Sequence, residues 1–399
     1  MVELIRKGEL PQPLEVVDGL RAAAAAALTM RLREPRPAGF PLLFTSHLQL
    51  IEPVIAFLHE HAIQRAHTAD TVRTYAEILY DWFDTLEQNG LQWSEADAVD
   101  LVAYRNRMLS EPSPHTHRAY SIGTINLRVR TVLRFYAWAV RNDWLRASAL
   151  LGRASDWGVS RRSQRPRRIY SSSADPIFVL RQFETLPCPL STGQARELLA
   201  WLIPPYDLMA RWQLYTGLRV SELLRLTCND ALQHETARLS LPPPAHYLIE
   251  VMRKGRKRGH VMASTSLMEE TAGFRSRHRD AWLKRATRQH RSAERGALFI
   301  NNRGAAAKKN TYQRVMLRAS TACGFKVTSH ALRSTFACMM LARLEQLAKQ
   351  GAAINPLLIV KILLGHEHIA TTDRYLRAIA VETCVLSDIL ESLLERAPP

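Results

Sequence analysis

A short apolar run that ends in glycine, near the C-terminal end of the chain, constrains the fold most. Pro356 is followed by leucine, isoleucine and valine side chains up to Leu364, which predicts a short, mostly buried helix. Gly365 suits the end of that helix because glycine adopts positive φ at little cost. His366 then lies just past a helix end. Tyr375, nine residues later, is expected inside the next helix, where the intervening loop can bring it back toward His366.

A tyrosine must be activated by neighbouring groups before it can act as a nucleophile. A phenol has a reference pKa of about 10, so it requires a nearby base or a strongly cationic pocket. The sequence offers Arg219 and the pair His330 and Arg333, which lie three residues apart and project from one face of a helix if Ser329 caps it. Arginines, histidines and a tyrosine together suit a phosphodiester, because arginine binds phosphate oxygens in a bidentate manner and keeps its charge.

These motifs occur in an order that resembles one known family. Thr216–Leu223 reads Thr-Gly-Leu-Arg-Val-Ser-Glu-Leu, His330 begins His-Ala-Leu-Arg, and Leu-Gly-His precedes Tyr375 by nine residues. The sequence His-x-Leu-Arg alone arises often by chance, whereas the ordered set at these separations is specific. The chain therefore resembles the tyrosine recombinases, also called the phage integrase family.

The resemblance implies a site-specific DNA recombinase that works through a covalent 3′-phosphotyrosine. Tyr375 would attack the scissile phosphate, and His330 would act as general base on its phenol. Two arginines and a histidine would hold the non-bridging oxygens, and a lysine would protonate the departing 5′ hydroxyl. The implied catalytic residues are Arg219, Lys254, His330, Arg333, His366 and Tyr375. The resemblance implies no metal and no nucleotide cofactor, because the bond energy is kept in the protein–DNA link.

A basic hairpin carries the implied lysine. Residues 247–252 and 260–263 read as two strands, and the segment between them is rich in lysine and arginine. The resemblance points to Lys254 as the general acid. The family pattern often places an arginine five positions after this lysine, where the chain has Gly259, so Lys257 remains a rival. In the alternative interpretation, the whole tip contacts DNA electrostatically and takes no part in catalysis.

The composition favours a polyanionic partner. The 399 residues include 54 Lys and Arg against 37 Asp and Glu, a formal net charge of +17. A surplus of this size indicates nucleic acid as the commonest partner. The resemblance implies double-stranded DNA at specific recombination sites. It also implies a homo-tetramer on DNA, or an assembly with partner recombinases, because exchange between two duplexes needs several active sites.

Motifs of other chemistries are missing from the sequence. The five cysteines are dispersed without Cys-x-x-Cys spacing, which argues for reduced thiols and against a disulfide framework or a zinc site. His366-Glu367-His368 lacks the His-Glu-x-x-His spacing, and neither a phosphate-binding Gly-x-x-x-x-Gly-Lys loop nor a Gly-x-Ser-x-Gly elbow occurs. The N-terminus does not read as a signal peptide, and Ala22–Leu28 is too short to span a bilayer. We expect a cytoplasmic protein with no membrane partner.

The chain divides into segments of different character. Residues 1–44 form an N-terminal extension that is either an arm or a packed element. A helical core-binding domain over 45–150, a basic interdomain linker over 151–188 and a catalytic domain over 189–399 are expected to follow. The predicted fold class is mainly α with a small β-hairpin or sheet, in which the helical DNA-binding domain precedes an α+β catalytic domain.

Helices dominate the predicted core-binding domain. Apolar side chains at three- and four-residue spacing predict helices over 71–87, from Ser94 to Met108, and over 124–144. Their arginines form either a solvated basic face or DNA contacts. The linker arginines suit phosphate contacts, or alternatively a merely flexible charged connection. They are Arg153, Arg161, Arg162, Arg165, Arg167 and Arg168.

In the predicted catalytic domain, local signals position Arg219. Gly217 predicts the turn that lets Arg219 point out of the core, and Glu222 either buttresses an arginine or is a surface acid at a helix N-terminus. Residues 378–395 predict an amphipathic helix whose apolar side needs covering. This helix either docks on a neighbouring protomer, as the resemblance implies, or packs within its own chain.

Two other functions are compatible with these residues. Type IB topoisomerases and telomere resolvases use a similar set of arginine, lysine, histidine and tyrosine, so strand rotation or hairpin formation is one alternative. A catalytically silent DNA-binding regulator that kept the fold is the other. Among recombinase roles, we expect integration, excision or transposition of a mobile element, while resolution of chromosome or plasmid dimers is not separated from these by sequence.

Overall fold

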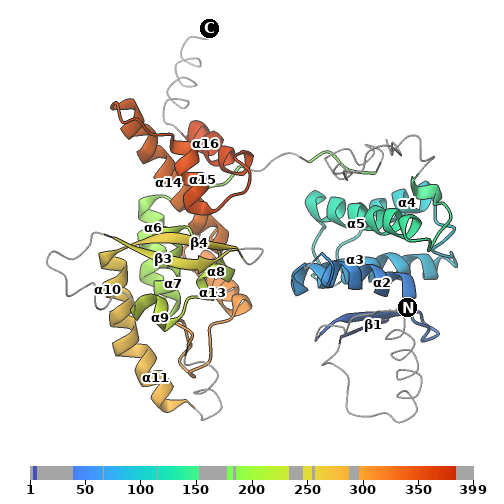
Figure 1. The fold of residues 1–399 in the computed structure, drawn as a ribbon, viewed down its shortest axis with the longest axis horizontal. Coiled ribbons are helices and arrows are strands. Elements are labelled where there is room, and N and C mark those ends of the chain that lie inside the picture. Colours follow the sequence, from blue (N-terminus) through green and yellow to red (C-terminus); the bar gives the residue numbers. More distant parts are fainter. Residues whose placement is uncertain are drawn as a thin grey trace, which may run out of the picture. The chain divides into compact units, whose positions relative to one another are not determined.

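The computed structural model divides into two compact units, Met1–Phe183 and Glu184–Pro399 (Figure 1). Both units are mainly helical, and each contains a two-stranded antiparallel sheet. This confirms the predicted fold class. The structure describes residues 3–6, 39–65, 67–114, 116–151, 178–182, 186–232, 246–253, 257–286 and 296–382.

The first unit consists of helices with a short two-stranded sheet packed on α2 and α3 (Figure 1). Its elements are β1 (Glu3–Arg6), β2 (Pro41–Phe44), α2 (Glu52–Ala62), α3 (Ala69–Gln88), α4 (Ala98–Ser110), α5 (Ile122–Arg141) and the 3₁₀ turn η1 (Ala149–Leu151). Aromatic side chains fill its core, where the indole of Trp82 donates to the Tyr136 hydroxyl at 3.3 Å. That hydroxyl donates in turn to the Trp93 carbonyl at 2.6 Å, so the polar atoms of these buried rings are satisfied.

Helix α4 begins later than the sequence predicts. The helix expected from Ser94 starts at Ala98, because Asp97 adopts an extended conformation and caps the helix. The Asp97 carboxylate accepts from the backbone N–H of Val99 and Asp100, and the Asp100 carboxylate accepts from the Asp97 N–H at 2.9 Å. This reciprocal capping box makes Asp97 the boundary. The two neighbouring helices, by contrast, begin a turn or less before their predicted starts.

Parts of the predicted extension and linker pack onto the first unit. Strand β2 pairs with β1, and Phe40 and Leu43 are buried in the core of this unit. Residues 178–182 also return to it, since the Asn126 amide exchanges hydrogen bonds of 2.8 and 2.9 Å with the backbone of Leu180. The alanine-rich stretch near residue 25 and all six linker arginines lie outside the described residues.

The second unit packs α14 against helices that carry or directly precede candidate site residues. Its elements are α6 (Thr192–Trp201), α7 (Tyr206–Thr216), α8 (Val220–Leu223), α9 (Cys228–Leu232), β3 (His246–Met252), β4 (Arg258–Ser264), α10 (Thr265–Phe274), the π-helical turn η4 (Arg275–Arg279), α11 (Asp280–Arg285), α13 (Lys309–Ala322), α14 (Ser329–Lys349), α15 (Pro356–Leu364) and α16 (Ala370–Glu382). Helix α14 packs against α7, α15 and α16 (Figure 1). The hairpin β3–β4 forms as predicted, in antiparallel register.

Two glycines end helices beside the site. Gly217 ends α7 at φ 67°, and a Cβ there would lie 2.5 Å from the ring of Phe336 on α14. Gly365 ends α15 at φ 62°, as predicted. Both positions need glycine because the left-handed conformation is costly for other residues.

Helix α15 is less buried than predicted. Only Val360 and Leu364 are buried along it, and Ile362 is 65% exposed. The helix is nine residues long and packs on α14 and α16 through one face, and Leu358 and Ile362 on its other side are exposed. Apolar composition alone could not show which face is covered.

Within the described residues, no helix is long and apolar enough to cross a membrane. In the same part of the chain, no three histidine, cysteine or acidic side chains cluster closely enough to hold a metal ion.

Candidate active site

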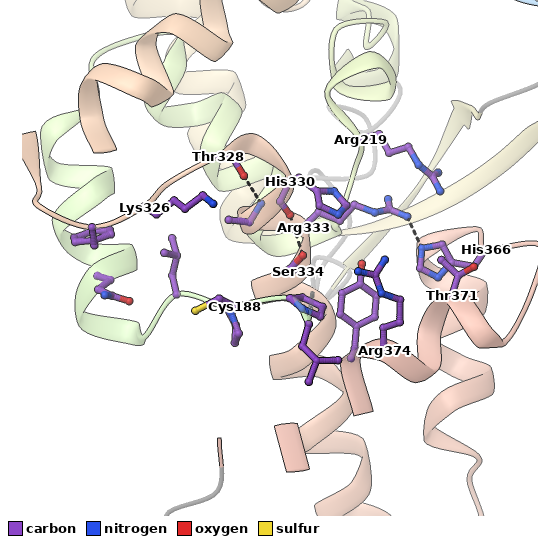
Figure 2. Close-up of a pocket in the computed structure, with 18 residues that line it drawn as sticks. Cys188, Arg219, Lys326, Thr328, His330, Arg333, Ser334, His366, Thr371 and Arg374 are labelled. Atoms are coloured by element: carbon purple, nitrogen blue, oxygen red, sulfur yellow. Dashed lines mark hydrogen bonds between the residues drawn. The ribbon is translucent and has the colours of Figure 1, made fainter. Parts of the chain in front are cut away.

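A pocket of about 520 Å³ in the second unit collects the predicted catalytic side chains. It is bounded by the segment before α6, the turn between α7 and α8, the first turn of α14, the turn after α15, and α16. Figure 2 shows Arg219, His330 and His366 gathered around the Arg333 side chain. Five of the six predicted site residues line this pocket: Arg219, His330, Arg333, His366 and Tyr375.

The predicted lysine is the exception. Lys254, between β3 and β4 in the sequence, lies outside the described residues. The alternative, Lys257, lies within the described residues but does not line the pocket. Its Nζ forms an ion pair of 2.5 Å with the Glu367 carboxylate. Both partners are about two-thirds exposed, at 67% and 68% of their side chains. The identity of the general acid therefore stays a prediction.

Arg333 is the buried centre of the site. Only 2% of the residue is exposed, and its guanidinium donates to the carbonyls of Gly217 at 2.5 Å and Leu364 at 2.8 Å. Burial, followed by the charge of Arg219, lowers the pKa of Arg333 to about 10. The side chain still carries its charge at neutral pH. Because α7, α14 and α15 all contact this one group, Arg333 ties together the elements that surround the pocket.

Glu222 holds the second arginine and is buried. Its carboxylate accepts from Arg219 Nη1 at 2.8 Å and from the Arg219 backbone N–H at 2.9 Å, and it lies 3.9 Å from Arg333 Nη1. Glu222 is 1% exposed, so it is the buttress and not a surface acid. The carboxylate offsets part of the charge of two arginines, and about a third of the Arg219 side chain stays exposed for a ligand.

His366 is held in one tautomer. Arg333 Nη2 lies 3.1 Å from His366 Nε2, and a guanidinium can only donate, so Nε2 accepts. The ring proton then sits on Nδ1, which donates to the Thr372 hydroxyl at 2.9 Å. Burial and the charge of Arg333 lower the pKa of His366 to about 3. The imidazole is therefore neutral near pH 7.

The candidate nucleophile lies beside this imidazole, with its ring nearly parallel to it. The rings of Tyr375 and His366 stack at a centroid distance of 6.1 Å and an angle of 12°. Tyr375 is 4% exposed, and its helix α16 packs on α14 and α15. The sequence prediction that the loop after α15 returns Tyr375 to His366 thus describes the observed geometry.

His330 occupies the first turn of α14, at the edge of the pocket. Thr328, and not Ser329, caps this helix, because its hydroxyl accepts from the Ala331 N–H at 3.0 Å. Burial of the ring, and then the charges of Arg333, Arg374 and Arg219, lower the pKa of His330. A neutral imidazole at this edge can accept a proton at neutral pH.

Several further residues line the pocket that sequence reasoning did not single out. Arg374 directly precedes Tyr375, and Lys326 lies four positions before His330, so proximity to the motifs was a usable signal for both. Cys188 reaches the pocket from the segment before α6 and carried no such signal. With Arg219 and Arg333, the two additional cations make the pocket strongly basic, which suits an anionic ligand.

The pocket brings a tyrosine together with arginines and histidines, a set of side chains that suits a phosphodiester, and comparison with known proteins shows which class of enzyme has this fold. The family model described as "Phage integrase family" matches residues 190–380, and the one described as "Phage integrase, N-terminal SAM-like domain" matches residues 54–143. Together they cover more than half of the chain. The chain belongs to the phage integrase family, the tyrosine recombinases, which cleave and rejoin DNA strands.

Curated relatives and solved structures are of the same kind. The chain is 24% identical over 325 residues to tyrosine recombinase XerC of Halalkalibacterium halodurans, covering 81% of this chain and 91% of that one. It is 27% identical over 347 residues to XerC of Mycobacterium tuberculosis, covering 85% and 95%. The XerH recombinase bound to a palindromic difH substrate has a TM-score of 0.53 at 17% identity, covering 85% and 89%. A lambda integrase dimer bound to a core site has a TM-score of 0.51 at 13% identity, covering 81% and 94%. At these identities, the structural likeness shows the fold.

Proposed function

We propose that this protein is a site-specific recombinase that cuts double-stranded DNA through a 3′-phosphotyrosine at Tyr375 and rejoins the strands in a new arrangement. The observation that carries the proposal is the pocket in which Tyr375 lies with three arginines and two histidines. A phosphodiester is the substrate that such a basic pocket with a phenol suits best.

The proposed chemistry begins with the phosphate at the pocket mouth. Arg219 is positioned by buried Glu222 and keeps exposed donors for the non-bridging oxygens. Arg333 adds a fixed buried charge that stabilises the negative charge developing in the transition state. His330 accepts the phenol proton as Tyr375 Oη bonds to phosphorus, and the 5′ oxygen leaves with a proton supplied by Lys254. Attack of the 5′ hydroxyl on the phosphotyrosine reverses these transfers and releases Tyr375.

His366 supports this step in a specific way. Both of its ring nitrogens are engaged within the protein, by Arg333 and by Thr372. In this arrangement, the imidazole positions Arg333 and packs against the Tyr375 ring. Donation from His366 to a phosphate oxygen, the role that the resemblance implied, requires the ring to exchange one of these partners for the DNA.

The proposed partner is double-stranded DNA, with a tetramer as the active assembly. Exchange of both strands between two duplexes requires four cleavages, so four copies of Tyr375 are needed if each acts once. The curated relatives carry the names XerC and XerD, and one structural neighbour is the Tn1549 transposon integrase bound to circular intermediate DNA. For the biological role, we keep integration, excision or transposition of a mobile element as the proposal, with resolution of DNA dimers as the competing role.

A trapping assay tests the proposal. Purified full-length protein is mixed with nicked suicide duplexes taken from the DNA that flanks its gene, in chelator, and analysed on a denaturing gel. A covalent adduct that disappears in Tyr375→Phe supports tyrosine-mediated cleavage. Absence of an adduct on DNA that the protein binds tightly and in a salt-sensitive manner would instead favour the silent DNA-binding regulator.

A second measurement separates recombination from the other strand-transfer reactions. A supercoiled plasmid without the trapped sequence is incubated with the protein. Relaxation of such a plasmid would favour a type IB topoisomerase, and closure of a cut site into hairpin ends would favour a telomere resolvase. Dependence on two paired copies of the trapped sequence is the result expected for a recombinase.

A further inference from the structure

Arg253, which directly precedes Lys254, is a buried arginine that the proposed mechanism does not use. It is 8% exposed. Its Nη1 donates to the Leu364 carbonyl at 2.9 Å, and its Nη2 donates to the carbonyls of Leu363 and His260, also at 2.9 Å. The side chain therefore links the β3–β4 hairpin to the carboxyl end of α15, the helix that ends one residue before the Gly365–His366 turn.

The acceptors explain why an arginine is suited to this position. The last carbonyls of a helix lack intrahelical partners and carry partial negative charge, so a cation there is favourable. A planar guanidinium can donate to three carbonyls from one fixed plane, whereas the compact ammonium of lysine cannot reproduce that geometry. Arg253 thus fixes the position of the carboxyl end of α15, in addition to offsetting the partial negative charge of its last carbonyls.

Two glycines make room for this side chain. A Cβ at Gly259 on β4 would lie 2.5 Å from Arg253 Nε, and a Cβ at Gly365 would lie 2.6 Å from Arg253 Cδ. Both distances are shorter than a van der Waals contact, so a side chain at either position would displace Arg253. The arginine therefore passes between two backbone segments that only glycine allows to approach so closely.

The Leu364 carbonyl connects Arg253 to the site. It accepts from Arg253 Nη1 at 2.9 Å and from Arg333 Nη2 at 2.8 Å. The same Arg333 Nη2 lies 3.1 Å from His366 Nε2. A shift of this carbonyl would therefore displace the donor that holds the imidazole.

We propose that Arg253 is a positioning residue that sets the geometry of the Arg333–His366 pair by fixing the carboxyl end of α15. The structural part of this inference concerns the folded protein alone. The effect of Arg253 on strand cleavage rests on the proposed function, so the geometry of the Arg333–His366 pair and the cleavage rate are measured separately.

The structural part is tested by nitrogen NMR of the full-length protein with ¹⁵N-labelled histidine. In the unchanged protein, His366 should show a protonated Nδ1 and an accepting Nε2, with its signals assigned by their loss in His366→Asn. Arg253→Met should move the Nε2 signal or mix the tautomers. Gly259→Ala should do the same, because it removes no hydrogen-bonding group but displaces Arg253. Arg225→Met is the matched control: Arg225 donates to the Met252 carbonyl of the same hairpin at 3.4 Å and does not reach α15.

The catalytic part is tested by the rate of adduct formation on the nicked suicide duplex. Arg253→Met and Gly259→Ala should slow the reaction about 10- to 100-fold, as small misplacements of catalytic groups do, while DNA affinity changes less than about threefold. Arg253→Lys should remain slow, because it restores the charge but not the three directed bonds. Arg225→Met should react at the unchanged rate.

The outcomes separate the two proposals. Unaltered His366 signals in folded Arg253→Met and Gly259→Ala overturn the positioning role whether or not DNA is cleaved. If Arg253→Met fails to fold, the His366 signals and the adduct rate of Gly259→Ala test the positioning role in its place. Full activity in Arg253→Lys also overturns the role, because charge alone would then suffice. If the unchanged protein forms no adduct but both variants alter the His366 signals, the positioning role stands and the proposed function fails.

Discussion

Arg333 Nη2 donates to His366 Nε2 at 3.1 Å, and this single contact determines the tautomer of the neutral imidazole. Because a guanidinium has no acceptor atom, His366 must carry its proton on Nδ1, and this N–H donates to the Thr372 hydroxyl at 2.9 Å. The neutral ring then packs against Tyr375. The buried cation, the neutral histidine and the tyrosine therefore form one unit, and changes to any member should affect the others.

Tyr375→Phe should abolish covalent DNA attachment without loss of DNA binding. The change removes only the hydroxyl, and the ring can still stack on His366. We expect adduct formation to fall more than about 10³-fold, as for loss of a catalytic nucleophile, with the dissociation constant nearly unchanged. Gel trapping and fluorescence anisotropy on the same duplex measure the two quantities. Persistent adduct in the variant would show that another residue attacks the phosphate.

Thr372→Val should be more harmful than Thr372→Ser. Thr372 is fully buried, and its hydroxyl is the acceptor for His366 Nδ1–H. Valine has nearly the same shape but leaves that N–H unsatisfied, which should cost about 1–3 kcal/mol in the free energy of unfolding. Serine keeps the acceptor. Urea denaturation and the adduct rate should both rank the valine variant below the serine variant, and equal behaviour of the two would show that the contact is unimportant.

Glu222→Gln should destabilise the second unit strongly. The carboxylate is buried between Arg219 and Arg333, and its neutralisation leaves buried positive charge without compensation. We expect a loss of about 3 kcal/mol in the free energy of unfolding. Glu270→Gln is the matched control, since Glu270 forms an exposed ion pair with Arg211 and should cost less than about 1 kcal/mol. Similar losses in the two variants would argue against the buttress role of Glu222.

Acidification should weaken the fold partly through His366. Its pKa is about 3 in the folded protein against an ordinary histidine value of 6.5, so the unfolded state binds more protons between these values. The contribution is fully present above pH 6.5 and is lost as pH falls toward 3, by about 2 kcal/mol at pH 5. His366→Gln should therefore show a smaller drop in unfolding free energy between pH 7 and 5 than the unchanged protein. Parallel pH dependences of the two proteins would contradict the neutral buried imidazole.

Features that depend on neighbouring residues were predictable from the sequence. The helix ends at Gly217 and Gly365 follow from the backbone freedom of glycine. The antiparallel hairpin follows from alternating apolar residues on both sides of a basic turn. Helix spacing and the chemistry of a phosphodiester pointed to the residues that line the pocket with Tyr375, and the resemblance to a known family supplied the roles expected of them.

Features that depend on packing between distant segments were decided by the tertiary structure. The burial of Glu222, which the sequence left open between a buttress and a surface acid, was decided by packing. The three carbonyl contacts of Arg253 and the Thr372–His366 hydrogen bond likewise depend on which segments the fold brings together. Helix α15 looked mostly buried because its composition is apolar, but composition does not reveal which face another element covers. Local propensity and motif order thus determined the elements and the class of chemistry, whereas burial and hydrogen bonding across the fold decided how each charge is held.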